Sequence, residues 1–509
     1  MNHEAQLYAE LTASLSKNNK LIYAGTLLAR AARLFPEKTA VIISPTESLT
    51  YEQLYQQASD ISRYLVAQGI KPGDHVCLLA ENSLFFYRAY WGIWQTGAIV
   101  IPLNVFLHQQ ELAHIMSDAK PHMFIISEKL APKLQEVSAS STKIITEKSL
   151  GTIPTENKPF TPIERPIDEL AALLYTSGTT GLPKGVMLSS RNILSNVIQG
   201  ICRFNITSDE RLFGALPLFH CLPQNTMVWV SCVLGATVIL VPHISRTTLI
   251  EGLALKPTII IGVPGLYSLF CQMKQLNFDN VRYSISGGDA VTEKIKTCFE
   301  QLYHRKLCNG YGLTEASPFV AIDVENEPAP LHCVGKPFIN IECEIRDGIT
   351  ENNETVGILW IKGPNIMLGY YNAPQATESV LQDGWLNTGD LAKIDSQGRI
   401  IMCGREKDII VNKGIKIYPQ EIETILQTHP AVLLAAVIGV RKTGAGDEYP
   451  VAYVTLKEPT TGIEKILHDL CVQRIAAYKV PRQFIVVDAL PLTSLGKINK
   501  KELRTNHAK

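Results

Sequence analysis

The strongest chemical signal in the sequence is a segment of small and hydroxyl residues that follows the apolar run Ala171–Leu174. The segment precedes a lysine, Lys184, and consists of Ser177, Gly178, Thr179, Thr180 and Gly181. Glycines let backbone amides approach an anion, hydroxyls add hydrogen-bond donors, and a lysine adds a point charge. The pattern predicts a phosphate-binding loop. A flexible surface turn would explain the glycines but not Lys184. A Walker A motif cannot be written here, so an ordinary P-loop ATPase or GTPase is disfavoured.

A carboxylate follows a glycine turn in the segment Tyr311-Gly-Leu-Thr-Glu315. A carboxylate close to a triphosphate repels it unless a cation lies between them, so Glu315 predicts a bound Mg²⁺. The segment Ser286-Gly-Gly-Asp-Ala290 offers two glycines, which suit a flat adenine ring against the backbone, with Tyr311 on the other face of the ring. Without the phosphate loop, Glu315 would read as a surface carboxylate and the glycines as an ordinary turn.

Two further charged positions lie late in the sequence. Asp390 ends a Thr-Gly-Asp turn and Arg405 follows it. A carboxylate that accepts hydrogen bonds from ribose hydroxyls is a common sugar-binding device. Lys497 lies in a Ser-Leu-Gly-Lys-Ile turn of a lysine-rich tail. Taken alone, Asp390 would be an ordinary turn residue and Lys497 an ordinary solvated side chain. The functional interpretation of both residues therefore depends on the other motifs.

Together these segments resemble the adenylate-forming superfamily, which contains acyl-CoA synthetases, aryl-CoA ligases, luciferases and the adenylation domains of peptide synthetases. The resemblance covers the sequence from about Ile22 to Arg504, and its motifs occur in the family's order. Besides the phosphate loop, the motifs are Leu49-Thr-Tyr-Glu-Gln-Leu54, Ser286-Gly-Gly-Asp-Ala290, Asn309-Gly-Tyr-Gly-Leu-Thr-Glu315, Gly384-Trp-Leu-Asn-Thr-Gly-Asp390, Gly404-Arg-Glu-Lys-Asp-Ile-Ile-Val-Asn-Lys-Gly414 and Pro491-Leu-Thr-Ser-Leu-Gly-Lys-Ile498.

The resemblance implies a role for each matching position. It implies that Thr314 contacts the α-phosphate of ATP, that Glu315 and Thr176 hold magnesium, and that Asp390 binds the ribose with help from Arg405. The other positions that it assigns to the nucleotide are Ser177, Gly178, Thr179, Thr180, Gly181, Lys184, Gly287, Gly288, Asp289, Tyr311 and Gly312.

The implied reaction has two halves. A carboxylate attacks the α-phosphate of ATP–Mg²⁺, which releases pyrophosphate and leaves an acyl–AMP anhydride; the thiol of CoA then attacks the acyl carbon and releases AMP. In similar enzymes the residue matching Lys497 reaches the reacting carboxylate and the α-phosphate, where it offsets developing charge. A small C-terminal domain swings between the two halves, so that Lys407 matches the hinge and Gly414 the glycine that lines the channel for CoA.

The segment Pro217-Leu-Phe-His220 matches the family segment that approaches the acyl group, which makes His220 a candidate catalytic residue. Relatives that activate amino acids place an Asp at the position of His220 to bind the ammonium group, so an amino acid is disfavoured. The side chains that follow are largely apolar and predict a medium- or long-chain fatty acid; they include Cys221, Leu222, Asn225, Met227, Val228 and Val230. An aryl acid, and an acyl carrier protein in place of CoA, stay open as alternatives.

A protein of a different class, a catalytically silent homologue that binds a nucleotide as a scaffold, is also conceivable from the motifs. Such a homologue is expected to have lost one or more of Lys184, Glu315, Asp390 and Lys497. All four residues are present. The sequence therefore favours an active acid–thiol ligase that uses ATP, Mg²⁺ and CoA.

A large α/β fold is needed to position these residues. Short β-branched runs alternate with helical patterns, as in His75–Ala80 and Leu84–Thr96, which predicts layered α/β subdomains with mostly parallel sheets. Turn signals crowd between Ala329 and Asp408 and predict a small antiparallel β subdomain. The pattern after Lys407 predicts a small α+β unit. We expect an N-terminal AMP-binding domain at residues 1–406 and a mobile C-terminal domain at residues 407–509.

Composition narrows the class of protein further. Of the 509 residues 46% are apolar, which supports a large core, and 48 basic residues balance 48 acidic ones, so nucleic acid is not an expected partner. The 11 cysteines show no C-x-x-C spacing, which argues against a zinc site or a disulfide framework. The N-terminal residues lack the apolar core of a signal peptide, and the run Thr226–Val241 is too short to span a bilayer. We expect a cytoplasmic protein with at most peripheral membrane contact.

Overall fold

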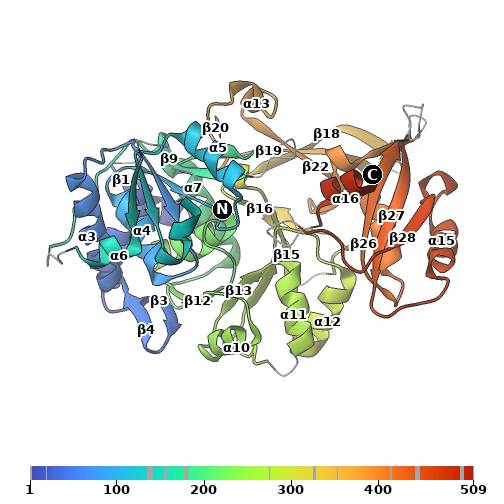
Figure 1. Ribbon diagram of the computed structural model, residues 1–509, viewed down its shortest axis with the longest axis horizontal. Coiled ribbons are helices and arrows are strands. Elements are labelled where there is room, and N and C mark those ends of the chain that lie inside the picture. The colour runs from blue at the N-terminus through green and yellow to red at the C-terminus, as the bar shows by residue number, and fades with distance from the viewer. Residues whose placement is uncertain are drawn as a thin grey trace.

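The structure is a computed structural model, shown in Figure 1. It describes residues 3–18, 20–134, 142–153, 158–176, 182–273, 276–324, 328–351, 354–412, 415–441, 448–492 and 498–507. The loop residues Ser177 to Gly181, the predicted channel glycine Gly414 and the predicted catalytic lysine Lys497 lie outside the described residues.

In the described part of the chain, seven strands form a first sheet in the order β20-β10-β9-β6-β5-β7-β8. The four pairs from β9 to β8 are parallel, whereas β10 pairs antiparallel with both β9 and β20. The strands are β5 His75–Leu79, β6 Ile99–Pro102, β7 Met123–Ile126, β8 Lys143–Thr146, β9 Leu170–Thr176, β10 Lys184–Ser189 and β20 Gly369–Tyr370.

A second sheet contains nine of the described strands in the order β17-β16-β15-β14-β13-β11-β12-β3-β4. It is parallel from β15 to β3 and antiparallel at both edges. The strands are β3 Thr39–Ser44, β4 Glu47–Thr50, β11 Arg211–Gly214, β12 Thr237–Leu240, β13 Ile259–Gly262, β14 Tyr283–Ser286, β15 Leu307–Gly312, β16 Phe319–Ile322 and β17 Lys336–Pro337.

Both sheets present one face to a shared apolar core and the other face to a separate layer of helices. In β13, for example, Ile259 and Ile261 enter the shared core while Ile260 packs on the opposite side, because neighbouring side chains of a strand point to opposite faces. Helices α3, α4, α7 and η3 contribute to the shared core, α5 covers the outer face of the first sheet, and α10 to α12 cover that of the second. Their bounds are α3 Tyr51–Ala67, α4 Leu84–Gln95, α5 Gln109–Ala119, α7 Ser190–Phe204, η3 Gln224–Val230, α10 Arg246–Ala254, α11 Pro264–Met273 and α12 Glu293–Tyr303.

The remaining helices of the N-terminal part are short or peripheral. They are α1 His3–Ser14, α2 Leu27–Leu34, α6 Glu147–Gly151, α8 Cys221–Pro223, α9 Ser231–Leu234 and α13 Pro374–Glu378. The apolar segment from Thr226 to Val241, which is too short to span a bilayer, lies in η3, α9 and β12 and is buried throughout. Among the described residues, no helix combines the length and apolar character that crossing a bilayer requires.

A small antiparallel sheet connects these layers to the C-terminal elements. Its strands are β18 Glu342–Glu351, β19 Glu354–Lys362, β21 Leu381–Gln382, β22 Trp385–Ile394 and β23 Ile400–Arg405. The turn η5, Glu406–Asp408, then leads to the hairpin of β24 Ile410–Asn412 and β25 Ile415–Ile417.

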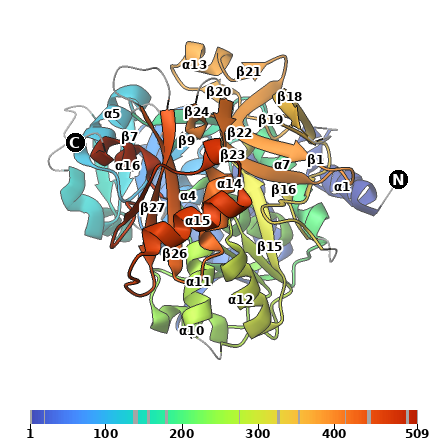
Figure 2. The same ribbon diagram turned by 90° about the vertical axis from the view of Figure 1, so that its right-hand side faces the viewer.

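The C-terminal elements build a separate small core at one end of the molecule (Figure 1). They are α14 Pro419–Gln427, β26 Val432–Arg441, β27 Glu448–Leu456, α15 Ile463–Arg474, β28 Gln483–Val486 and α16 Lys500–His507. Figure 2 looks at the molecule from this end and shows α14 and α15 nearest to the viewer. The predicted architecture, layered α/β subdomains with a small β subdomain and an α+β C-terminal part, is therefore confirmed.

Candidate active site

Glu315 lies in the short turn η4, Thr314–Ala316, which follows strand β15. Its Oε1 accepts a hydrogen bond of 2.8 Å from the hydroxyl of Tyr370, and its backbone oxygen accepts one of 2.9 Å from the amide of Met367. Burial is the main influence on this carboxyl group and raises its pKa, while the hydrogen bond from Tyr370 acts in the opposite direction. Tyr370 orients the carboxylate, but burial disfavours its charged form. A divalent cation, which prefers oxygen ligands, would stabilise that charge.

Tyr370 also links Glu315 to the flanks of the predicted phosphate loop. It lies on β20 and pairs with Val186 of β10, and its ring centroid is 5.3 Å from the Nζ atom of Lys184. Lys184 begins β10 and is the Cα partner of Thr176 on β9. The two ends of the loop are thus held side by side by an antiparallel pair, next to the carboxylate predicted to hold magnesium. Tyr370 is absent from the sequence-based site, because nothing in its local sequence marks a partner 55 residues away.

Asp390, Arg405 and Tyr311 form a second cluster. Asp390 lies opposite Arg405 in the ladder of β22 and β23, and its Oδ1 is 3.1 Å from the Nε atom of Arg405. Its Oδ2 accepts a hydrogen bond of 2.7 Å from the hydroxyl of Tyr311. The charge of Asp390 raises the pKa of Arg405, and burial followed by the same charge raises the pKa of Tyr311. The carboxylate predicted to bind ribose is therefore fixed on both sides, and Tyr311 joins it to the predicted adenine wall.

The predicted adenine wall lies at the end of β14. The amide of Gly287 donates to the oxygen of Gly262 at 3.0 Å, and Gly288 has a φ of +84°, a conformation that favours glycine. Asp289 accepts from the amide of Ala290 at 2.8 Å. A Cβ atom at Gly287 would lie 3.6 Å from Leu222, so the start of the predicted acyl wall adjoins this strand end.

Gly312 shapes the turn that carries Thr314 and Glu315. A Cβ atom at this position would lie 2.1 Å from the carbonyl oxygen of Pro318, a distance that no side chain can accept. The close approach allows the amide of Leu313 to donate to the same oxygen at 2.9 Å. Thr314 is buried inside the turn that results, with 9% of its surface exposed.

His220 and Lys407, two further predicted site residues, belong to separate elements. His220 precedes α8, and its Nδ1 accepts a hydrogen bond of 3.3 Å from the amide of Leu222. Lys407 lies in η5, where burial and the nearby charge of Arg405 lower its pKa. The next residue, Asp408, is paired at 2.7 Å with Arg504 of α16, so this turn is tied to the C-terminal elements.

The geometry thus brings most of the described site residues together. Glu315 and Tyr311 lie on one continuous segment, and Asp390 and Arg405 are close enough to Glu315 to influence its pKa. The positions of Ser177 to Gly181, Gly414 and Lys497 stay sequence-based predictions, because they lie outside the described residues.

Comparison with known proteins identifies the family of this chain. Residues 28–371 match the AMP-binding enzyme family, and residues 421–497 match the AMP-binding enzyme C-terminal domain. A feruloyl-CoA synthase from Amycolatopsis sp. is 31% identical over 489 residues, which cover 94% of this chain and 98% of the relative. A long-chain-fatty-acid–CoA ligase from Bacillus subtilis (strain 168) is 29% identical over 532 residues, covering 94% and 93% of the two chains.

A solved structure of a CoA synthetase has a fold similar to that of this chain. The O-succinylbenzoate coenzyme A synthetase (MenE) of Bacillus subtilis, in complex with ATP and a magnesium ion, superposes with a TM-score of 0.85 at 28% identity. The superposition covers 95% of this chain and 99% of that one. Because the family model matches most of the chain and its relatives are CoA ligases, the chain belongs to the AMP-binding enzyme family and is an acid–thiol ligase.

Proposed function

We propose that the protein joins a carboxylic acid with an apolar body to CoA, with a medium- or long-chain fatty acid as the first candidate. In the first half-reaction an oxygen of the acid forms a bond to the α-phosphorus of ATP, and the bond to pyrophosphate breaks. In the second, the CoA sulfur forms a bond to the acyl carbon, AMP leaves with the bonding electrons, and the thiol proton is lost to solvent. The observation that carries the proposal is the pairing of Glu315 with Tyr370 beside Lys184, next to the cluster of Asp390, Arg405 and Tyr311.

Each described residue has a proposed task in this scheme. Asp390, held by Tyr311 and Arg405, accepts hydrogen bonds from the ribose, while Gly287 and Gly288 leave room for the adenine ring. The N-terminal end of β10 brings the Lys184 ammonium to the phosphates.

Magnesium fits the donor set at Glu315. The carboxylate is oriented by Tyr370 and carries a pKa raised by burial, so a nearby cation would offset the cost of keeping it charged. Glu315 and the hydroxyl of Thr176 would hold the ion. When bound, magnesium would supply positive charge against the phosphate oxygens, which favours the departure of pyrophosphate.

The roles proposed for residues of the C-terminal part are based on the sequence alone. We propose that Lys497 contacts the reacting carboxylate and the α-phosphate, that the chain turns about Lys407 between the two half-reactions, and that Gly414 lines the path of CoA. A boundary between residues 406 and 407 is supported by the turn η5, which separates the β22–β23 ladder from the β24–β25 hairpin.

An aryl acid is the second candidate. The apolar wall that begins at Leu222 and continues through Met227 and Val228 is compatible with an alkyl chain or a ring. The feruloyl-CoA synthase and the long-chain-fatty-acid–CoA ligase are similar to this chain to nearly the same degree, which supports both candidates.

The test is thioester formation with ATP and magnesium against acetate, octanoate, palmitate, benzoate, 4-hydroxycinnamate and several amino acids, with and without CoA. We expect CoA-dependent turnover with octanoate or palmitate, and turnover confined to the aromatic acids would favour the second candidate. Pyrophosphate release that depends on the acid, is limited to one equivalent and is not accelerated by CoA would instead indicate a carrier-protein acceptor. Failure with every acid while ATP still binds would contradict the proposed function.

A further inference from the structure

Two partly exposed cysteines lie between adjacent helices on the outer face of the second sheet. Cys271 is in α11 and Cys298 is in α12, and these helices run side by side in both views of the molecule (Figure 1 and Figure 2). The thiol of Cys271 donates to the backbone oxygen of Ile295 on α12, with its Sγ atom 3.9 Å from that oxygen. Ile295 precedes Cys298 by three residues, and residues three apart share one face of a helix. Both thiols therefore lie on the facing sides of α11 and α12.

The pKa values of neighbouring groups agree with this placement. Burial, followed by a hydrogen bond with the thiol of Cys298, raises the pKa of Cys271 to about 12. Burial, followed by the charges of Cys271 and Cys298, raises the pKa of Tyr303 on α12 to about 12. Cys271 is therefore a protonated thiol at neutral pH, in contact with a second thiol.

Cys298 differs from Cys271 because a lysine lies one helical turn before it. Lys294 and Cys298 are four residues apart on α12, so their side chains are neighbours. Burial and the nearby Lys457 lower the pKa of Lys294, whereas the charge of a Cys298 thiolate acts in the opposite direction. A positive charge beside a cysteine favours its thiolate, which is the form that reacts with oxidants. Cys298 is thus placed to react first with an oxidant, and Cys271 to react with the product.

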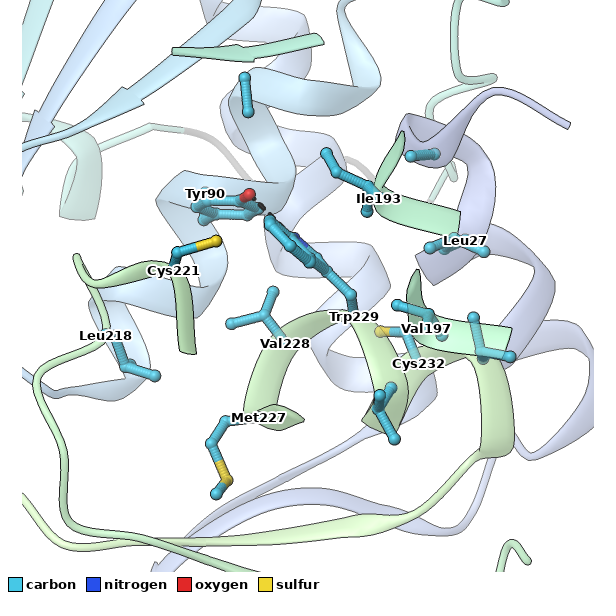
Figure 3. Close-up of a cluster of buried hydrophobic side chains, with 14 of the residues drawn as sticks. Leu27, Tyr90, Ile193, Val197, Leu218, Cys221, Met227, Val228, Trp229 and Cys232 are labelled. Carbon is cyan, nitrogen blue, oxygen red and sulfur yellow. Dashed lines mark hydrogen bonds between the residues drawn. The ribbon is translucent and has the colours of Figure 1, made fainter. Parts of the chain in front are cut away.

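Fully buried cysteines of the protein lack these features. Cys221 and Cys232 lie inside the apolar cluster of Figure 3, together with Val228 and Trp229. Burial raises the pKa of both thiols well above the usual value. A protonated thiol that is buried in apolar surroundings is inert. Partial exposure, a neighbouring lysine and a second thiol coincide at Cys298.

We propose that Cys298 and Cys271 form a reversible disulfide when the protein meets hydrogen peroxide. The Cys298 thiolate takes one oxygen atom from the peroxide, which gives a sulfenic acid and releases hydroxide. The Cys271 sulfur then forms a bond to the Cys298 sulfur, and the sulfenic hydroxyl leaves with the thiol proton as water. The two sulfur atoms are oxidised and the peroxide is reduced. A dithiol reductant restores both thiols by exchange.

This disulfide would enclose the predicted adenine wall. The chain from Cys271 to Cys298 contains β14 and the segment Ser286–Ala290, and the amide of Gly287 donates to Gly262, two residues before α11. A bond between thiols that are now only in contact would draw α11 and α12 together and displace the wall. We expect the KM for ATP to rise by about three- to tenfold on oxidation, because small displacements of a binding group are costly. This effect on ATP rests on the proposed function, whereas formation of the disulfide does not.

The first measurement treats the reduced full-length protein with hydrogen peroxide, alkylates the remaining free thiols, and identifies cross-linked peptides by mass spectrometry after proteolysis. We expect a peptide pair joined through Cys271 and Cys298 that disappears after treatment with dithiothreitol. Cys298→Ser should abolish the cross-link. In Cys271→Ser the sulfenic acid of Cys298 should persist and react with dimedone. Absence of the cross-link from the oxidised wild-type protein would overturn the inference.

Cys403→Ser is the matched control for the cross-link. Cys403 is also partly exposed, its thiol donates to the oxygen of Ile401 at 3.6 Å, and burial raises its pKa to about 11. The weaker influences on its pKa come from Lys393 and Glu354 rather than from a second thiol. We expect Cys403→Ser to form the cross-link as readily as the wild type. Loss of the cross-link in this variant as well would show that the proposed pair is not specific and would overturn it.

The second measurement compares the KM for ATP before and after peroxide in the wild type and in Cys298→Ser. We expect the KM to rise in the wild type alone and to recover with dithiothreitol. A cross-link that forms and leaves the KM unchanged would overturn the effect on the nucleotide site. A reduced protein that activates no acid contradicts the proposed function instead, and the mass of the cross-linked peptides still decides whether the disulfide forms.

Discussion

At the scale of single residues, the site depends on side chains that hold other side chains. Tyr370 orients Glu315 from one strand, and Tyr311 orients Asp390 from another. Both tyrosines donate to a carboxylate, and the pKa of each tyrosine is raised, so both remain donors at neutral pH. The two predicted nucleotide-binding carboxylates are thereby fixed in position before any ligand is bound.

Replacing Tyr370 by phenylalanine should move the acid limb of the pH profile. Glu315 is proposed to hold magnesium in its ionised form, so activity should fall as the pH drops through the pKa of this carboxyl group, which burial has already raised. The Tyr370 hydroxyl favours the ionised form; its loss raises the pKa further, and the acid limb shifts to higher pH. The measurement is kcat/KM for ATP–magnesium against pH, with Tyr371→Phe as the control. Superimposable profiles for Tyr370→Phe and the wild type would contradict this role.

Gly312→Ala tests the turn below Glu315. The added methyl would lie 2.1 Å from the oxygen of Pro318, so the turn must move and displace Thr314 and Glu315. A displacement of about 1 Å at a reacting group can cost about 100-fold in rate, and we expect a loss of this size in pyrophosphate release. Gly265→Ala is the control, because a Cβ atom there meets nothing within 4 Å. Equal activity of the two variants would show that the turn tolerates the methyl.

At the scale of elements, the site gathers where strands end or pair. The β9–β10 pair holds Thr176 beside Lys184, the β22–β23 ladder holds Asp390 beside Arg405, and β15 runs directly into η4. Each of these residues belongs to a hydrogen-bonded strand or to the turn that follows one. Backbone hydrogen bonds therefore hold the residues at fixed distances from one another, although not all of them are in direct contact.

A small apolar contact between elements joins the β subdomain to the C-terminal part. Ile358, Trp360 and Leu391 pack against Ile409 and Tyr418, which follow the turn η5. Beside them lies a cavity of about 170 Å³ whose wall includes the charged residues Asp347, Glu406 and Lys416. The contact must open if the chain turns at Lys407 between the half-reactions.

Ile358→Glu should weaken this contact. Ile358 is 7% exposed, so a carboxylate there would be buried close to Glu406 and would destabilise the junction by about 1–3 kcal/mol. Ile394→Glu is the control, since Ile394 is 38% exposed at the end of β22. Urea unfolding should show an earlier transition for Ile358→Glu alone. Identical transitions for the two variants would argue that the contact contributes nothing to the junction.

Much of the fold and part of the site follow from the sequence. The alternation of strands and helices predicts the layered, mostly parallel sheets, and the turn-rich stretch up to Asp408 predicts the small antiparallel sheet of β18, β19, β21, β22 and β23. The contact of Tyr370 with Glu315 does not follow from the sequence, since packing rather than sequence separation brings the two residues close.

At the scale of the whole molecule, the proposed mechanism requires two arrangements of the C-terminal part. Lys497→Ala should lower the formation of acyl–AMP by about 100- to 1,000-fold, because the lysine is proposed to stabilise charge at the α-phosphate. Thioester formation from supplied acyl–AMP and CoA should change by no more than a few fold, since that half-reaction uses the other arrangement. Lys501→Ala, an exposed lysine on α16, is the control. An equal loss in both half-reactions would contradict a role confined to adenylation.

In the proposed reaction the acid attacks ATP at its α-phosphate, and CoA then receives the acyl group. The identity of the nucleotide product tests this most directly, by chromatography of reactions containing the full chain, ATP, magnesium, CoA and octanoate or 4-hydroxycinnamate. The proposed reaction predicts AMP, pyrophosphate and acyl-CoA in equal amounts, with AMP formation dependent on the acid. Formation of ADP and phosphate, or of AMP without thioester in the presence of CoA, would contradict it.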